Sequence, residues 1–222
     1  MLAPAHAMIP TSSPAPALPA SFPTPPPVTP APLLQPNPPR NRRGTLAFDV
    51  ARLLRLPNHG PPELQWDIWR LSDSALHRTN RGIIYRLDST DLNAAATNPP
   101  TEAITITCRV GAIADFWPEF TVGGRSIVTV DDVLDAIYRH FHTVISDSEF
   151  WEIMRMNRKN GEVLTNAQRD RGIHANQLYE TATREGPRRI DCLGDDHYFK
   201  GLQVEHGTND MCKLELHLDS VA

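Results

Sequence analysis

The sequence predicts an α+β fold: a mainly antiparallel sheet with about three helices on one face, preceded by a disordered proline-rich tail. Two observations lead to this prediction. After residue 62, strand-like patterns occupy both ends of the chain and helical patterns occupy its middle. That order is typical of α+β domains, whereas a doubly wound sheet alternates strands and helices along the chain. The second observation is the distribution of proline, which separates a tail from a single domain over residues 62–222.

Residues 1–44 are predicted to be a disordered tail rich in proline and alanine. Of the 21 prolines in the chain, 14 lie in residues 1–40, and proline interrupts helices and sheets because it lacks a backbone N–H. The same prolines break every apolar run that a secretory signal would need, and no arginine of a transit peptide precedes Arg40. We therefore expect an intracellular protein, cytoplasmic or nuclear, with no membrane association. Whether the tail is a ligand or only a spacer stays open.

The first part of the domain is predicted to contain short strands. Residues 45–61 are interpreted as a short helix or linker, because apolar side chains recur at helical spacing until Pro57 ends the run. Residues 64–69 (LQWDIW) then alternate apolar and polar side chains, which is typical of a strand. A second short strand is predicted in residues 82–87 (GIIYRL).

Two longer strands are predicted to form a hairpin. Residues 103–110 (AITITCRV) alternate isoleucine with threonine, the pattern of a half-buried strand. Residues 117–122 (WPEFTV) follow after a loop and lead into a glycine turn. The two segments therefore favour adjacent, antiparallel strands.

The middle of the domain is predicted to be helical. A first helix follows Thr129, which has Asp132 three residues later as an N-cap pattern, and apolar residues line one face through Val144. A second helix opens at Ser146, where Glu149 completes a capping box. Both helices therefore have a start signal as well as an apolar face.

The chain after Gly161 is predicted to form a third helix and then to return to strands. A capping-box pattern at Thr165 favours the start of that helix, and Gly172 is expected to break it. Three strands are then predicted, at residues 188–193, 199–206 and 211–218. Residues 207–210 supply a hairpin turn for the last two.

Several motifs occur in a fixed order along the domain. They are Trp66-Asp67, Ala96-Thr97-Asn98-Pro99-Pro100, Val128-Thr129-Val130-x-Asp132-Val133-Leu134-x-x-Ile137, and Leu193 followed by Phe199-x-Gly201-Leu202. With these motifs, residues 62–220 resemble a family of domains of unknown function found mainly in fungi. The resemblance implies no established activity, cofactor or catalytic residues.

The charge distribution disfavours nucleic acid as a partner. The formal net charge is −4, and Arg40, Arg42 and Arg43 are the only charged residues before residue 45. Removing these three from the 22 basic residues leaves 19 against 26 acidic ones, a net charge of −7 for the rest of the chain. An acidic domain repels the phosphate backbone.

The sequence carries no pattern for a cofactor, a metal or an activated nucleophile. Cys108, Cys192 and Cys212 are far apart and odd in number, so we expect buried, reduced thiols rather than zinc ligands. Phosphate-binding and serine-nucleophile motifs are missing. His140 and His142 point to different sides of a helix and are expected at the surface. No cofactor and no metal are therefore expected, and the catalytic residues stay unknown.

Residues 194–197 suggest an alternative function. Asp195, Asp196 and His197 combine two carboxylates with an imidazole, groups that serve in acid–base catalysis and in metal binding. Neighbouring residues rarely converge on one ion, so a solvated turn is the preferred interpretation. An enzyme whose site assembles around these residues only in the fold is the alternative.

Basic residues give the leading hypothesis. Arg155, Arg158, Lys159, Arg188 and Arg189 could share one ridge that binds an acidic protein partner, although a solvated face is the commoner explanation of such a set. On this basis the chain is predicted to be a non-catalytic intracellular protein-interaction domain with a flexible proline-rich N-terminal arm. Its protein partner is unknown.

Overall fold

The computed structural model describes residues 48–123, 126–157, 159–174, 185–205 and 212–220. The predicted tail, residues 1–44, and the predicted turn, residues 207–210, lie outside these ranges. Within the described ranges, no helix combines the length and the apolar character needed to cross a bilayer.

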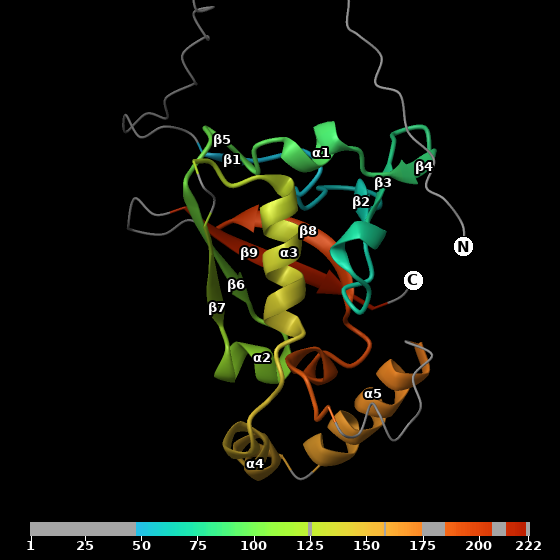
Figure 1. The fold of residues 1–222 in the computed structure, drawn as a ribbon, viewed down its shortest axis with the longest axis vertical. Coiled ribbons are helices and arrows are strands. Elements are labelled where there is room, and N and C mark those ends of the chain that lie inside the picture. Colours follow the sequence, from blue (N-terminus) through green and yellow to red (C-terminus); the bar gives the residue numbers. More distant parts are fainter. Residues whose placement is uncertain (1–47, 124–125, 158, 175–184, 206–211, 221–222) are drawn as a thin grey trace, which may run out of the picture. The chain divides into compact units, whose positions relative to one another are not determined.

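A four-stranded sheet forms the centre of the domain (Figure 1). Its strands are β6 (Ala103–Cys108), β7 (Glu119–Gly123), β8 (Tyr198–Val204) and β9 (Lys213–Asp219), in the order β7-β6-β9-β8. The pairs β6–β7 and β8–β9 are antiparallel, and β6 runs parallel to β9. All four coincide with strands that the sequence predicts, and the predicted β6–β7 pairing is confirmed.

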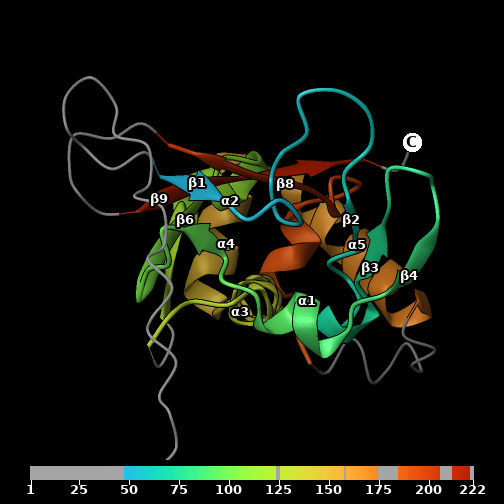
Figure 2. The same cartoon turned by 90° about the horizontal axis from the view of Figure 1, so that it is seen from above.

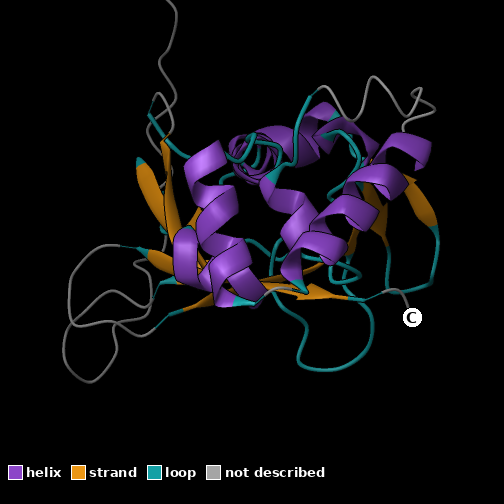
Figure 3. Cartoon of the chain, turned by 90° about the horizontal axis from the view of Figure 1, so that it is seen from below, coloured by secondary structure: helices purple, strands orange, loops and turns teal. Residues whose placement is uncertain are grey.

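The helices cover one side of this sheet. The alternation in β6 buries Ile104 and Ile106 while Thr105 between them is only half-buried. Helix α3 (Val130–Phe141) runs across the sheet (Figure 1), and Figures 2 and 3 show the other helices on the same side. The predicted α+β fold class, with a mainly antiparallel sheet, is thereby confirmed.

The start of α3 is the capping box that its sequence predicts. Asp132 N donates to Thr129 Oγ1 at 3.2 Å, and Thr129 N donates to Asp132 Oδ2 at 2.9 Å, so two exposed amides at the helix start are satisfied. The apolar face ends earlier than expected, because Val144 lies beyond the helix and is 52% exposed. The buried residues of α3 are Val130, Val133, Leu134, Ile137, His140 and Phe141.

Two further helices follow, and the second differs from its prediction. Helix α4 (Asp147–Met156) begins at the predicted capping box, but α5 (Asn160–His174) begins five residues before Thr165. Gly161 and Gly172 lie inside α5 instead of bounding it, and both are buried. A Cβ on Gly161 would collide with the Met154 side chain of α4, so tight helix packing explains this glycine.

A second, smaller sheet lies beside the first. It contains β2 (Leu64–Gln65), β3 (Leu76–Arg78) and β4 (Ile84–Arg86), all antiparallel, in the order β2-β3-β4. The 3₁₀ helix η1 (Ser72–Ser74) connects β2 to β3, and the short helix α1 (Ser89–Asn93) follows β4. The strands predicted in residues 64–69 and 82–87 are thus present in shortened form.

The helix expected in residues 45–56 is not formed by the described residues of that segment. Asp49–Val50 form strand β1, which pairs with β5 (Thr97–Asn98). Further along, Leu56 N donates to Leu202 O at 2.9 Å, and Leu202 N donates to Leu54 O at 2.7 Å. Backbone pairing with β8 and burial of Leu54 therefore override the helical spacing of the apolar residues.

Two more segments depart from the sequence predictions. Residues 188–193, expected to be a strand, instead form the 3₁₀ helix η2 (Arg189–Cys192). Asp191 accepts a hydrogen bond from Arg188 N at 2.8 Å, which caps that turn. An unpredicted helix, α2 (Gly111–Phe116), fills the connection between β6 and β7.

Candidate functional site

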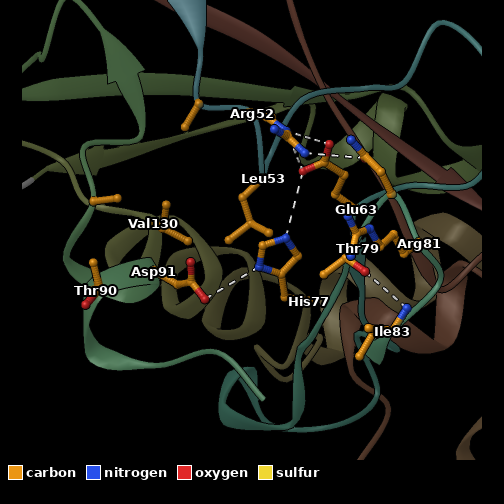
Figure 4. Close-up of a pocket in the computed structure, with 13 residues that line it drawn as sticks. Arg52, Leu53, Glu63, His77, Thr79, Arg81, Ile83, Thr90, Asp91 and Val130 are labelled. Atoms are coloured by element: carbon orange, nitrogen blue, oxygen red, sulfur yellow. Dashed lines mark hydrogen bonds and ion pairs between the residues drawn. The ribbon is translucent and has the colours of Figure 1, made fainter. Parts of the chain in front are cut away.

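A cleft opens between the β2-β3-β4 sheet, the segment that follows β1, and the helices α1 and α3. Its volume is about 710 Å³. Figure 4 shows His77 of β3 at its centre, between the carboxylates of Glu63 and Asp91. The apolar lining is Ala51, Leu53, Ile83, Ala94 and Val130, and the polar lining includes Arg52, Glu63, His77, Asn80, Arg81 and Asp91.

Both ring nitrogens of His77 face groups of the protein. His77 and Tyr85 are cross-strand partners, and Tyr85 Oη lies 2.7 Å from His77 Nδ1. Partial desolvation and the charge of Asp91 raise the pKa of Tyr85, so the phenol stays protonated. The same Nδ1 lies 3.6 Å from Asp91 Oδ2. The Nε2 of His77 faces Glu63 Oε2 at 3.9 Å. The imidazole therefore connects Tyr85 of β4 with the carboxylates of Glu63 and Asp91.

An ion pair closes one side of the cleft. Arg52 Nε lies 2.7 Å and 3.0 Å from the two carboxylate oxygens of Glu63. The hydrogen bond from Glu63, followed by its charge, raises the pKa of Arg52. The charge of Glu63 is thus balanced within the cleft, while the other lining arginine, Arg81, has no ion pair among the described residues.

Strand β4 is an edge strand with free backbone groups. Arg78 N donates to Glu63 O at 2.6 Å, so the N–H and C=O groups of Arg78 point toward β2. By alternation, those of His77 point toward β4. The N–H and C=O groups of Tyr85, the cross-strand partner of His77, consequently point toward β3. Ile84 and Arg86 then direct their N–H and C=O groups outward, where no described residue pairs with them.

The edge strand is exposed and flanked by unpaired positive charge. Ile83, Ile84 and Tyr85 are 60%, 49% and 40% exposed. Single exposed apolar residues are common, but three in a row on a free edge are not. The guanidinium groups on this hairpin that form no ion pair within the described chain are those of Arg78, Arg81 and Arg86.

The basic residues that the sequence placed on one ridge differ in exposure. Arg155, in the last turn of α4, and Lys159 are exposed and form no ion pair with a described residue. Arg158 lies outside the described residues. The neighbouring helix surface is partly apolar, because Trp151 is 64% and Met156 is 55% exposed.

Arg188 and Arg189 are half-buried and make intramolecular contacts instead. Arg188 lies 2.9 Å from Glu185 Oε2 and 3.1 Å from His142 Nδ1. The Arg189 guanidinium lies 4.7 Å from the centroid of the Trp117 ring. These two arginines therefore serve the interior of the domain rather than an exposed ridge.

The residues of the alternative site are not brought together. Asp195 and Asp196 are exposed, as a solvated turn predicts, whereas His197 is only 8% exposed. Its Nδ1 lies 2.9 Å from Asp67 Oδ1, and its ring stacks on Trp69 at 4.3 Å. Burial opposes ionisation of Asp67, but hydrogen bonds from His197 and Trp69 N outweigh it and lower the Asp67 pKa. Asp67, quoted above only as part of a motif, is thus the partner of His197.

Two other histidines also differ from expectation. His140 is 8% exposed, and His142 is half-buried with Nε2 at 3.0 Å from Ile68 O, so neither is a surface residue. Both belong to the end of α3, where the sheet and η2 cover them. Among the described residues, no three histidine, cysteine, aspartate or glutamate side chains are grouped to hold a metal ion.

The free edge of β4 could not be identified from the sequence, although one signal was present. The segment from Arg81 to Arg86 places three apolar residues between two arginines without the alternation of a half-buried strand. Charged residues bounding a short exposed strand are a common protection of sheet edges. That pattern indicates an edge, but only the pairing order shows which side is free.

Comparisons with known proteins give a family. Neither the curated proteins nor the solved structures contained a match to the chain. Residues 64–210, more than half of the sequence, match DUF6699, a family of unknown function. Its matched region holds β2 to β8 and hence most of the cleft. The chain belongs to this family, DUF6699.

Proposed function

We propose that the domain is a non-catalytic protein-interaction module that binds an extended, acidic segment of another protein along the free edge of β4. The observation that carries the proposal is the exposed edge itself, with two outward-facing backbone units at Ile84 and Arg86. Addition of a peptide strand to such an edge is a recurring recognition mode, in which main-chain hydrogen bonds supply affinity.

The two faces of the hairpin favour different side chains on the added strand. On the cleft face, Ile83 and the apolar wall around Leu53 and Val130 suit an apolar side chain. On the opposite face, Arg78 and Arg86 suit a carboxylate. Because side chains alternate along a strand, the expected ligand alternates apolar and acidic residues.

Charge complementarity favours a partner other than the chain's own N-terminal region. Residues 1–47 contain no aspartate or glutamate, so they cannot neutralise the hairpin arginines. Many of them are prolines, which cannot donate to an edge. A segment of a second protein therefore fits the edge better.

The non-catalytic assignment is supported by the chemistry of the polar residues. The pKa of Tyr85 is raised rather than lowered, so this phenol is not prepared as a base, and both ring nitrogens of His77 already face groups of the protein. Asp195 and Asp196 are exposed to solvent, whereas His197 is buried. A catalytic site assembled around these residues therefore has less support than peptide binding along the edge of β4.

The proposed setting is the interior of a fungal cell. Support comes from the motif resemblance and from Cys108, Cys192 and Cys212, which are free thiols. Burial raises the pKa of Cys108 to about 11 and that of Cys192 to about 12, so these thiols stay protonated and unreactive. Reduced cysteines are typical of intracellular proteins.

Fluorescence anisotropy tests the proposed function. The probe is a labelled peptide of alternating valine and glutamate, and a valine–lysine peptide is its charge control. Ile84→Pro removes an outward N–H and should weaken binding at least about tenfold, or about 1.4 kcal/mol. Arg86→Glu should weaken it as well, with a smaller salt dependence.

A matched control is available at the other free edge. Thr105 N donates to Cys212 O at 2.9 Å, so the backbone N–H of Thr105 points toward β9. The backbone N–H of its cross-strand partner, Thr121 on β7, therefore points outward. Thr121→Pro therefore repeats the same change on an edge without the hairpin arginines. Equal loss of binding in the Ile84→Pro and Thr121→Pro variants, or equal affinity for both peptides, would contradict the proposal.

A further inference from the structure

A second pocket lies on the domain, between β7 and α3 and away from the His77 cleft. Its volume is about 550 Å³. Phe120, Asp135, Arg139, His140 and Arg189 are among its lining residues. Two of these, His140 and Arg189, hold buried nitrogens that have no hydrogen-bond partner among the described residues.

His140 presents an unsatisfied donor. Its Nδ1 lies 3.3 Å from Arg189 Nη1, and because a guanidinium only donates, Nδ1 must accept. The ring is 8% exposed and stacks on Phe120 at 4.1 Å. Burial, with the nearby Arg189 charge, lowers the pKa of His140 to about 4, so the ring is neutral and its proton is on Nε2. That Nε2–H is buried without an acceptor in the described chain.

Arg189 is a cation without a carboxylate partner. No aspartate or glutamate oxygen of the described residues lies within ion-pair distance of its guanidinium, which rests on the Trp117 ring at 4.7 Å. The charge of Glu149 acts on Arg189 without an ion pair, and Glu149 Oε1 accepts a hydrogen bond from Trp117 Nε1 at 2.8 Å. A half-buried cation of this kind is costly unless an anion is available to it.

The acidic residues of the pocket are already engaged. Asp132 accepts two hydrogen bonds from Thr129, at 2.9 Å from N and 2.7 Å from Oγ1, as the cap of α3. Asp135 pairs with Arg139 at 2.5 Å. Neither carboxylate contacts Arg189, so the positive charge and the His140 donor are left for a ligand.

We propose that this pocket binds a small oxyanion, a carboxylate or a phosphate, between Arg189 and His140. A guanidinium presents several donors in a plane that matches either group. One oxygen of the ligand would pair with Arg189, and the Nε2–H of His140, which the protein covers in this structure, would donate to the same group after a rotation of the ring. The site is independent of the β4 edge, since the two share no lining residue.

Titration with inorganic phosphate and with acetate tests the proposal, using NMR signals of the His140 ring and the Arg189 side chain. We expect saturable shifts, and the His140 pKa should rise when the site is filled. Arg189→Gln should weaken binding by about tenfold or more, because a charge-assisted hydrogen bond is lost. His140→Phe keeps the stacking but removes the donor and should also weaken binding, by a smaller factor.

The controls distinguish a built site from general charge attraction. Arg155→Gln removes an exposed, unpaired cation elsewhere and should leave the affinity unchanged within about twofold. If Arg189→Gln perturbs folding, Arg189→Lys is the substitute because it keeps the charge. Arg189→Lys should bind the anion more weakly than the parent chain does, but more tightly than the double variant that combines His140→Phe with Arg189→Lys. Saturation by phosphate alone or by acetate alone identifies the ligand source. Absence of saturable shifts with either anion, or equal weakening by Arg155→Gln and Arg189→Gln, would overturn the proposal.

Discussion

Arg171 and Asp191 form a buried ion pair that fastens α5 to η2. Arg171 Nε donates to Asp191 Oδ1 at 3.0 Å, and Nη2 donates to Oδ2 at 3.3 Å. The exposed fractions are 6% for Arg171 and 0% for Asp191. The structure therefore places this arginine in the interior with a fully enclosed partner.

Removing Arg171 should therefore be costly. In Arg171→Ala the Asp191 carboxylate stays buried without its cation, and the free energy of unfolding should fall by about 3–5 kcal/mol. Urea denaturation measures the change. Arg169→Ala, two residues earlier in α5 and 53% exposed at its side chain, should change the free energy of unfolding by no more than about 0.5 kcal/mol. Equal effects of the two variants would show that the buried pair is not a major contributor.

Gly201 should tolerate no side chain. It lies at a register shift in β8 with φ of 146°, and a Cβ there would sit 2.5 Å from the Leu56 backbone. Gly201→Ala should lower the free energy of unfolding by about 2 kcal/mol or more, because the segment that carries Leu53 into the cleft must move. Gly123→Ala is the control, since its Cβ would meet nothing within 4 Å. Thermal unfolding that ranks the two variants equally would refute this account.

His140 should make stability depend on pH below neutrality. Its pKa is near 6.5 when unfolded and about 4 in the fold, so between these values the unfolded chain binds a proton that the folded chain does not. Stability should therefore fall as the pH drops from about 6.5 to about 4, by at most about 3 kcal/mol. The groups around it are Arg189, Phe120, Asp132, Asp135 and Arg139.

Unfolding of His140→Phe over the same pH range measures that contribution. The variant should lose less stability than the parent chain as the pH falls from about 6.5 to about 4. His59→Phe, at an exposed position, should keep the parent's pH dependence. Parallel curves for the parent chain and His140→Phe would contradict the assignment.

The sequence predicted those elements in which local signals and tertiary packing agree. Thr129 and Ser146 start α3 and α4 because their side chains cap the helices without help from distant residues. The isoleucines of β6 alternate with threonines, and both isoleucines are buried as that pattern requires, although Thr107 and Cys108 are buried too. Local chemistry was sufficient in these cases.

Elsewhere, distant contacts decided the structure. Leu54 lies in a segment with helical spacing, yet its carbonyl pairs with Leu202, about 150 residues later. Asp67 and His197 are 130 positions apart, so no local pattern could join them. The candidate site depends on the same kind of information, because β4 becomes an edge only through the order β2-β3-β4.

Amide hydrogen exchange at β4, followed by NMR with and without the valine–glutamate peptide, tests the central claim most directly. The pairing assigns outward N–H groups to Ile84 and Arg86, whereas Tyr85 N–H already faces His77. Binding along the edge predicts that exchange slows at Ile84 and Arg86 by about tenfold or more at saturation, with a much smaller change at Tyr85. Uniform slowing at all three amides, or no slowing at Ile84 and Arg86 while the peptide is bound, would contradict the account.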